Sequence, residues 1–308
     1  MPKLMRQTGD RAGVTLVEVI IVLVLMGIVG SALSGLFVSQ QRFYRDSDQV
    51  AGVRRELRSG AGILPLDLRA VSSVGGDILD FDETMIEVNA PLGSGITCEA
   101  GGDSLVLLPD DLSRATLSSF WAEPIAGDTI RVFDDGPSFG AEDDTWQAYE
   151  VASVSSSTSA CAVSPYADAV VDAPALKPRR VIRIAGAATL PSTIGAGVAV
   201  RATRPMRYSL FQPTGSAAWY LGLEQFEDGA WSDISVASGP YRSPTDGGLR
   251  FTYFDTTGAP INSATRIREI ARIDVELRAE SEFSGSSLRG SQPIRDSLML
   301  RVGVRNYK

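Results

Sequence analysis

Histidine is absent from this chain of 308 residues. Histidine is the commonest general base near neutral pH and the commonest ligand of transition metals in proteins. The sequence also contains no Gly-x-Ser-x-Gly nucleophile elbow and no phosphate-binding P-loop motif. These absences argue against the usual hydrolases, nucleotide-binding enzymes and transition-metal centres. We therefore expect a protein that is not an enzyme and has no catalytic residues.

Basic residues are outnumbered by acidic ones. The chain has 29 lysines and arginines against 37 aspartates and glutamates, which gives a formal net charge of −8. An acidic surface opposes binding to the phosphate backbone of DNA or RNA. Nucleic acid is therefore not expected among the partners of this protein.

One long segment lacks charge almost completely. Glu18 is the only ionisable residue between Val14 and Val38, and the 20 residues from Val19 to Val38 carry no charge. Roughly 20 apolar residues, each rising about 1.5 Å along a helix, span the hydrocarbon core of a membrane. The segment predicts a transmembrane helix over residues 14–38. A cleaved secretory signal peptide is the alternative, with a small-residue site at Ser31-Ala32-Leu33 or Ser34-Gly35-Leu36.

Glu18 is the unusual residue of this segment. A carboxylate inside a membrane costs a few kcal/mol on insertion scales, so a polar partner is expected for it. The alternative is an acid at the membrane interface, close to a helix N-terminus whose dipole favours negative charge. Position alone does not separate these two interpretations.

The order of these features resembles a known signal. A short basic leader, Gly13, and an apolar segment with Glu18 at its fifth position resemble the class III signal of type IV prepilins and type II secretion pseudopilins. The resemblance implies that residues 1–13 form a leader peptide, which prepilin peptidase removes between Gly13 and Val14. It also implies N-methylation of the new amine of Val14, with Glu18 facing such an amine and docking neighbouring subunits. Two departures are Val14, where phenylalanine is usual, and Gly35, where many major pilins have proline.

Small residues line one part of the predicted transmembrane helix. Such residues let helices approach closely in lipid, although glycine is also common in membrane helices without that role. The candidate packing residues are Gly27, Gly30, Ser31, Ser34 and Gly35.

Helical periodicity continues beyond the membrane segment. Apolar residues recur every three or four positions, with one interval of seven, and form one stripe along a helix face: Phe43, Val50, Val53, Leu57, Ala61, Leu64, Leu68 and Val71. We expect one long helix whose second half, residues 39–75, packs on a globular domain. Pro65 is expected to kink or break it near Ile63 or Leu64, and Gly75-Gly76 to end it.

The remaining chain, residues 76–308, is predicted to be β-rich. Short runs of alternating or apolar residues, separated by Gly-, Asp- and Pro-containing turns, predict strands: 86–88, 105–108, 129–133, 148–151, 181–184, 198–201, 206–211, 219–223, 249–253, 273–279 and 298–304. Residues 212–216 predict a hairpin loop. The expected fold class is α+β, a long N-terminal helix packed on a C-terminal antiparallel sheet, as in the type IV pilin fold. Residues from about 90 to 180 predict an inserted subdomain that carries both cysteines.

The only two cysteines, Cys98 and Cys161, permit one disulfide. An exported domain lies in an oxidising compartment, where such a pair forms a structural bridge. Two unlinked thiols that are buried as small apolar groups are the alternative.

Acidic loops raise the question of calcium, which takes oxygen ligands from such loops. The main cluster is Asp134, Asp135, Glu142, Asp143 and Asp144, and a smaller one is Asp80, Asp82 and Glu83. Neither cluster has the spacing of a known calcium motif, so solvated acidic loops are the alternative. The four tryptophans are expected to be core or interface anchors rather than a sugar-stacking site: Trp121, Trp146, Trp219 and Trp231.

The C-terminal pattern resembles a subgroup of the family. Residues 249–255, the run 267–277, the closing strand 302–306 and the segment 64–69 resemble J-type minor pseudopilins and W-type minor pilins. Glu18 argues against the K-type tip subunit, which typically lacks this acid.

The resemblance implies a minor subunit of a type IV pilus or a type II secretion pseudopilus. It would be inserted in the bacterial inner membrane with its C-terminal domain in the periplasm, and would assemble near the filament tip and help initiate assembly. The implied partners are other minor subunits, the major subunit, prepilin peptidase and the inner-membrane assembly platform. Alternatives are a surface-exposed minor pilin that acts as an adhesin or DNA-uptake receptor, and a single-pass membrane enzyme. Arginines flank the apolar segment on both sides, so the leader rather than the charge count sets the orientation.

Overall fold

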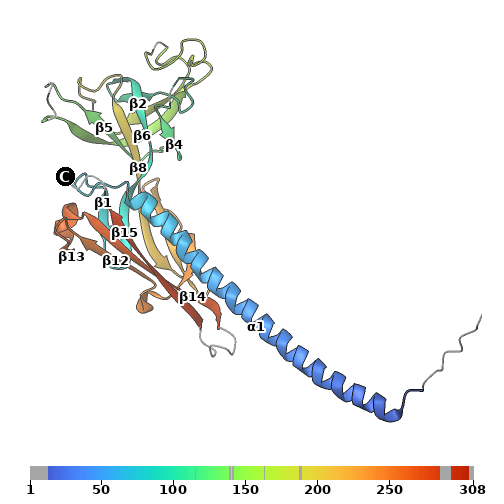
Figure 1. Ribbon diagram of the computed structural model, residues 1–308. Coiled ribbons are helices and arrows are strands. Elements are labelled where there is room, and N and C mark those ends of the chain that lie inside the picture. Colours follow the sequence, from blue (N-terminus) through green and yellow to red (C-terminus); the bar gives the residue numbers. More distant parts are fainter. Residues whose placement is uncertain are drawn as a thin grey trace, which may run out of the picture. The chain divides into compact units, whose positions relative to one another are not determined.

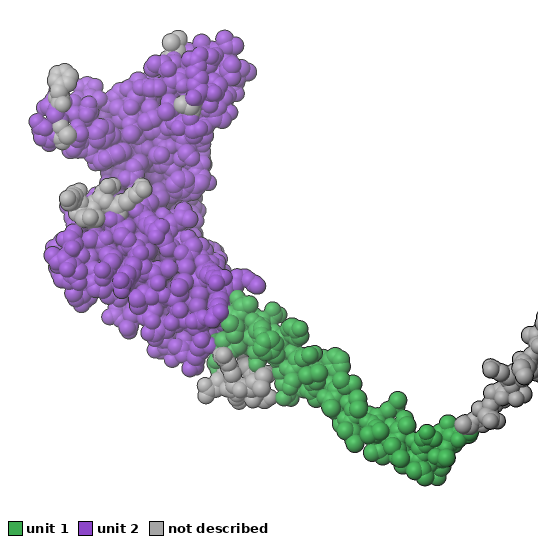
Figure 2. All heavy atoms as spheres, viewed as in Figure 1, with its two compact units in different colours: residues 1–52, 283–294 green, residues 53–282, 295–308 purple. Residues whose placement is uncertain are grey.

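The computed structural model describes residues 13–114, 116–138, 140, 142–162, 164–186, 189–284 and 293–304. The leader, apart from Gly13, and residues 305 and 306 of the predicted closing strand lie outside the described residues. The chain divides into two compact units, distinguished by colour in Figure 2. Unit 1 contains residues 1–52 and 283–294, and unit 2 contains residues 53–282 and 295–308.

The α+β architecture predicted from the sequence is confirmed: a long N-terminal helix precedes a domain of antiparallel strands (Figure 1). Helix α1 (Leu16–Leu68) contains 53 residues. Its buried residues all belong to unit 2: Val53, Leu57, Gly60, Leu64 and Leu68. Their spacing of three or four follows the predicted stripe from Val53 onward, with Gly60 in place of Ala61, and this face of the helix packs on the strands of unit 2. The prediction is wrong for Phe43, which is 63% exposed.

The sequence predicted a kink or a break near Pro65. The break does not occur, because α1 continues through this residue and ends at Leu68. Pro65 cannot donate a backbone hydrogen bond, but it lies in the last turn, where the Arg69 N–H still donates to the Pro65 carbonyl at 3.1 Å. Complete burial of Leu64 and Leu68 holds this turn in place. The helix also ends before the predicted glycine stop. Instead, the Asp77 carboxylate accepts the Ser72 N–H at 2.8 Å and closes the loop that follows.

The helix packs mainly on strands from the C-terminal part of the chain. A four-stranded sheet has the order β13 (Pro260–Ile261), β12 (Leu249–Phe254), β14 (Arg272–Ser284) and β15 (Pro293–Gly303). In the register of β12 and β14, Leu249 lies opposite Leu277 and Phe251 opposite Val275. All four of these side chains are buried in one core with the α1 stripe. Two short 3-10 helices, η1 (Pro244–Asp246) and η2 (Ala264–Glu269), flank these strands in the chain.

The other described strands form one eleven-stranded sheet. Its members are β1 (Ile78–Phe81), β2 (Met85–Gly101), β3 (Ser104–Leu107), β4 (Ser119–Phe120), β5 (Thr129–Asp134), β6 (Thr145–Ser157), β7 (Arg179–Ile184), β8 (Ala199–Phe211), β9 (Trp219–Glu227), β10 (Ala230–Trp231) and β11 (Ser235–Tyr241). Long strands β2 and β8 pair antiparallel from Met85 to Ile96 and contribute to two separate cores. The predicted runs 198–201 and 206–211 are therefore one strand, and the predicted hairpin at 212–216 joins β8 to β9.

Part of this sheet closes on itself as a barrel. The antiparallel pairings run β2–β3, β3–β7, β7–β6, β6–β5, β5–β8 and finally β8–β2. Two strands switch partners along their length: β2 changes from β8 to β3, and β6 changes from β5 to β7. Each has a bulge near its switch, between Thr97 and Glu99 in β2 and between Val151 and Ser153 in β6. Bulges are how strands turn the corners of such barrels.

The barrel has its own apolar core, distinct from the core against α1. Its buried residues are Leu92, Leu105, Leu107, Ile130, Val132, Val151, Ile182, Ile184, Leu190, Ile194, Val200 and Ala202. The barrel therefore uses β7 and the first half of β8 as well as the predicted insertion from about 90 to 180. Short strands β1, β4, β10, β11 and β13 were not predicted from the sequence, because runs of two to seven residues give a weak periodic signal.

Candidate functional site: the N-terminal half of the helix

Up to Val38, the part of α1 in unit 1 exposes apolar side chains around its whole circumference. Within unit 1, the large apolar residues of the segment from Val14 to Val38 are between 46% and 79% exposed. The helix is long and apolar enough to cross a membrane, and none of that apolar segment is buried in the chain. Removing apolar surface from water is favourable by roughly 25 cal/mol per Å². A helix of this kind is stable in hydrocarbon or against other apolar helices rather than in water.

Glu18 lies in the first turn of the helix, where the Thr15 hydroxyl caps its N–H. The Glu18 N–H donates to the Thr15 Oγ1 at 3.3 Å, and Thr15 precedes the first helical residue. The sequence Thr15-Leu16-Val17-Glu18 has the Thr-x-x-Glu pattern that satisfies free N–H groups at a helix start. Sequence reasoning missed this role, although the pattern directly before an apolar run was the available signal. No ion-pair partner of the Glu18 carboxylate is present among residues 13–114 and the other described ranges.

Gly13 and Val14 lie immediately before α1, in a segment without regular structure. Both are exposed, Val14 by 71%. An exposed, irregular segment is accessible to a protease, whereas a helical one must first unwind. The junction between Gly13 and Val14 is therefore open to cleavage in this structure.

The predicted packing glycines face open space. A Cβ atom added to Gly27, Gly30 or Gly35 would meet nothing within 4 Å. The hydroxyls of Ser31 and Ser34 donate to the carbonyls of Ile28 and Gly30, at 2.8 and 2.9 Å. Because both hydroxyls are satisfied inside the helix, this surface presents small groups without an unpaired donor. It is free to receive another helix.

The predicted calcium residues are not gathered into a metal site. Asp134 accepts from the Gly136 N–H and the Gln147 side chain, both at 3.2 Å, and Asp143 accepts from the Ser138 N–H at 2.9 Å. Hydrogen bonding from Ser138 lowers the pKa of Asp143, while burial and neighbouring acids such as Asp135 raise the pKa of Asp144. Among the described residues, no group of three or more His, Cys, Asp or Glu side chains could hold a metal ion.

The two cysteines lie together in the barrel. The sulfur atoms of Cys98, on β2, and Cys161, after β6, are joined at 2.05 Å. The bridge closes a separation of 63 residues and ties the end of β6 to the opposite side of the barrel. In the chain-entropy view, a loop of this length contributes about 4 kcal/mol to stability.

The tryptophans are not core residues. Trp121 is 67% exposed and Trp146 is 43% exposed, while Trp219 and Trp231 are partly buried. The expectation of core anchors is therefore wrong for these residues, and the expectation of interface anchors stays a prediction. The Arg207 guanidinium lies over the Trp231 ring, 4.0 Å from its centre, in a cation–π contact.

Comparison with known families agrees with the geometry of the helix start. Residues 9–34 match the model of the prokaryotic N-terminal methylation motif. The match includes the Gly13–Val14 junction, Glu18, and the packing residues Gly27 to Ser34, and it supports a pilin-like or pseudopilin subunit of the type IV class. No curated protein and no solved structure matches the chain.

Proposed function

We propose that this chain is a minor pilin or pseudopilin subunit. Prepilin peptidase cleaves it after Gly13, and the new amine of Val14 is methylated. Helix α1 anchors the protein in the inner membrane, and the β-rich domain lies in the periplasm. It assembles near the tip of a type IV pilus or a type II secretion pseudopilus, of the J or W type, and helps initiate assembly. The observation that carries the proposal is the methylation motif at residues 9–34 on an unburied apolar helix.

The chemistry of assembly follows from the two ends of this motif. Cleavage leaves a positively charged amine on Val14, four residues before the Glu18 carboxylate. A carboxylate in a medium of low dielectric constant is stabilised by a cation, and the first turn already concentrates positive partial charge. Glu18 of one subunit would pair with the Val14 amine of its neighbour. The small residues from Gly27 to Gly35 would let neighbouring helices approach closely.

The N-terminus of the mature protein tests the first step. Mass spectrometry of the protein from the producing bacterium should find Val14 as a methylated first residue. An intact Met1, or a cut close to Leu36, would contradict a prepilin.

Substitution of Glu18 tests the docking step. Glu18→Leu should leave membrane insertion intact and reduce incorporation into filaments by at least about tenfold, because the charge pair is lost. Glu18→Gln is the matched variant, since glutamine keeps the size of the side chain and the Thr-x-x-Glu/Gln pattern but carries no charge. We expect Gln to impair incorporation as well. Full incorporation with Gln would show that the charge of Glu18 is not required.

A further inference from the structure

The second half of β6 has a neighbouring strand on one side only. β6 pairs with β5 from Thr145 to Glu150, and with β7 from Val151 to Ser157. β5 begins at Thr129, opposite Glu150, so β5 has no residue beside the later part of β6. The corner that closes the barrel therefore leaves one edge of β6 open.

The hydrogen bonds of β7 define which groups lie on that edge. The Ile184 N–H donates to the Asp103 carbonyl at 2.9 Å, so the main chain of Ile184 faces the side of β3. Main-chain groups alternate in direction along an antiparallel strand. Those of Arg183 and Val181 therefore face β6.

The register between β7 and β6 shows which main-chain groups of β6 face β7. Ser153 lies opposite Arg183 and Ser155 opposite Val181, so these two serines use their main-chain groups toward β7. The N–H and C=O groups of Val154 and Ser156 consequently point away from β7. No described residue provides a hydrogen-bond partner for them on that side.

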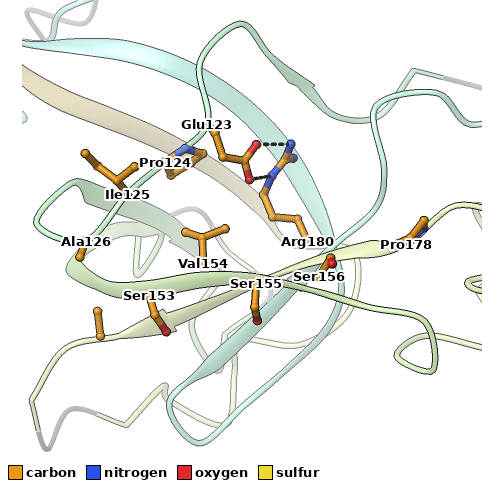
Figure 3. A pocket seen from close by; sticks show the side chains of 11 residues that line it. Glu123, Pro124, Ile125, Ala126, Ser153, Val154, Ser155, Ser156, Pro178 and Arg180 are labelled. Carbon is orange, nitrogen blue, oxygen red and sulfur yellow. Dashed lines mark hydrogen bonds and ion pairs between the residues drawn. The ribbon is translucent and has the colours of Figure 1, made fainter.

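A cavity of about 640 Å³ lies along this edge (Figure 3). One wall is residues 152–156 of β6, and the other is the segment Glu123 to Ala126. The N–H groups of Pro124 and Ile125 in the second wall are not available to bond to β6. Pro124 has no N–H, and the Ile125 N–H donates to the Asp128 carboxylate at 2.8 Å. The groove thus combines free main-chain groups with apolar side chains of Pro124, Ile125 and Val154.

The groove carries no net charge. Residues 151–163 contain no ionisable side chain. Two lining residues are charged, Glu123 and Arg180, and they are joined by two hydrogen bonds, Nε to Oε1 at 2.8 Å and Nη2 to Oε2 at 2.9 Å (Figure 3). Arg180 also pairs at 3.3 Å with Asp110, which does not line the groove. A charged ligand would have to lose its hydration without gaining a free counter-charge here. The electrostatics therefore favour an uncharged occupant.

Open strand edges are normally protected against unwanted pairing by charged residues or proline. The outer strand of the smaller sheet, β15, follows this rule with Arg295, Asp296 and Arg301. The stretch 152–157 of β6 contains neither a charge nor a proline. An unprotected edge beside a groove is a feature of surfaces that accept a strand from a partner.

We propose that the outer edge of β6 at Val154 and Ser156 receives an extended, uncharged segment of another polypeptide as an added strand. The main chain of the segment bonds to the N–H and C=O groups of these two residues. Its alternate side chains contact Pro124, Ile125 and Val154, and the others face solvent. The disulfide between Cys98 and Cys161 fixes the end of the receiving strand.

Amide hydrogen exchange of the full chain in detergent micelles tests the proposal at single residues. The probe is the peptide acetyl-Thr-Val-Ser-Val-Thr-amide, and the control is the same peptide with every backbone N–H methylated. In the free chain, the amides of Val154 and Ser156 should exchange fast and those of Ser153 and Ser155 slowly. The probe should slow Val154 and Ser156 at least about tenfold, and the control peptide should not.

Two variants separate the edge from the fold. Ser156→Pro removes an N–H that faces the groove and should weaken peptide binding at least about tenfold, with the unfolding midpoint unchanged within error. Ser156→Ala changes the same side chain but keeps the N–H, and should bind like the parent. Equal binding by the Pro and Ala variants would overturn the proposal.

Other outcomes overturn it as well. Unchanged exchange at millimolar probe would show that the edge does not accept a strand. Slow exchange of Val154 and Ser156 in the free chain, with sedimentation of a dimer, would show that a second copy covers the edge instead.

Discussion

The two halves of helix α1 have the same backbone geometry but opposite surroundings. In the half before Val53 no helical residue is buried, although most of its first 25 residues are apolar. In the half from Val53 to Leu68, one stripe of five residues is buried and the opposite face is polar or exposed. The segment of the first half up to Val38 needs an apolar environment around its whole circumference, whereas the second half needs one along a single line.

The difference shows how one helix can serve two purposes. Burial of the α1 stripe against the strands of unit 2 stabilises that unit and leaves little apolar surface of the second half exposed. The first half leaves its apolar surface available for a membrane or for other helices. Substitutions of the same kind in the two halves should therefore affect different properties of the protein.

Leucine truncation should show the largest contrast. Leu64 is fully buried, and Leu64→Ala should lower the free energy of unfolding of unit 2 by about 2–5 kcal/mol, because it loses packing and leaves a cavity. Leu23 is 63% exposed, and Leu23→Ala should leave that free energy unchanged. Denaturant unfolding of the full chain in micelles, followed by tryptophan fluorescence, measures both. An equal loss of unfolding free energy in both variants would show that the two halves of the helix do not differ in this way.

Glycine substitution should give the next largest effect. A Cβ on Gly60 would lie 3.0 Å from Leu277 Cδ1 and 3.1 Å from Ser238 Oγ, and would collide with the Tyr241 hydroxyl. That hydroxyl donates to the Glu56 carbonyl at 3.0 Å, so it cannot move freely. Gly60→Ala should destabilise unit 2 by about 1–3 kcal/mol in the same assay. Gly30→Ala is the control: unit 2 should remain as stable as in the parent, and filament assembly should weaken.

Aspartate substitution should give the smallest effect and a dependence on pH. Asp67 accepts the Tyr208 hydroxyl, and burial raises its pKa above 3.8. A raised pKa means that the folded state binds this proton more tightly than the unfolded state. The favourable contribution is complete below pH 3.8 and is lost as pH rises through the folded-state pKa.

Asp67→Asn keeps an acceptor for Tyr208 but removes the titration. From about pH 3 to pH 7, the stability of the variant relative to the parent should rise, because the parent alone loses the contribution of the protonated carboxyl. A flat difference for Asp67→Asn would show that its carboxylate is not buried in solution.

Local patterns predicted the helix well and its end poorly. The intervals of four and seven between Val53, Leu57, Leu64 and Leu68 require only the helix period, so the buried stripe was readable from the chain. Pro65 was expected to disturb the helix because local rules describe a proline without its surroundings. Packing of Leu64 and Leu68 in the core of unit 2 outweighed the one missing hydrogen bond.

The barrel was beyond sequence reasoning for a related reason. Its closure depends on pairings between distant segments, such as Ile96 with Ala199 and Thr97 with Leu107. Alternation identifies a strand but not its neighbours, and the bulges in β2 and β6 that change those neighbours leave no regular pattern. The open edge at Val154 and Ser156 follows from these pairings and was equally invisible.

The sequence by itself determined the character of the N-terminus. The order of Gly13, the Thr-x-x-Glu pattern that ends at Glu18 and the uncharged residues that follow predicts a helix start and an apolar surface from local chemistry, and neither needs a distant partner. The tertiary structure alone decided where the helix ends, how β2 and β6 close a barrel, and which edge remains open. Those features arise from contacts between residues far apart in the chain, which a one-dimensional pattern does not record.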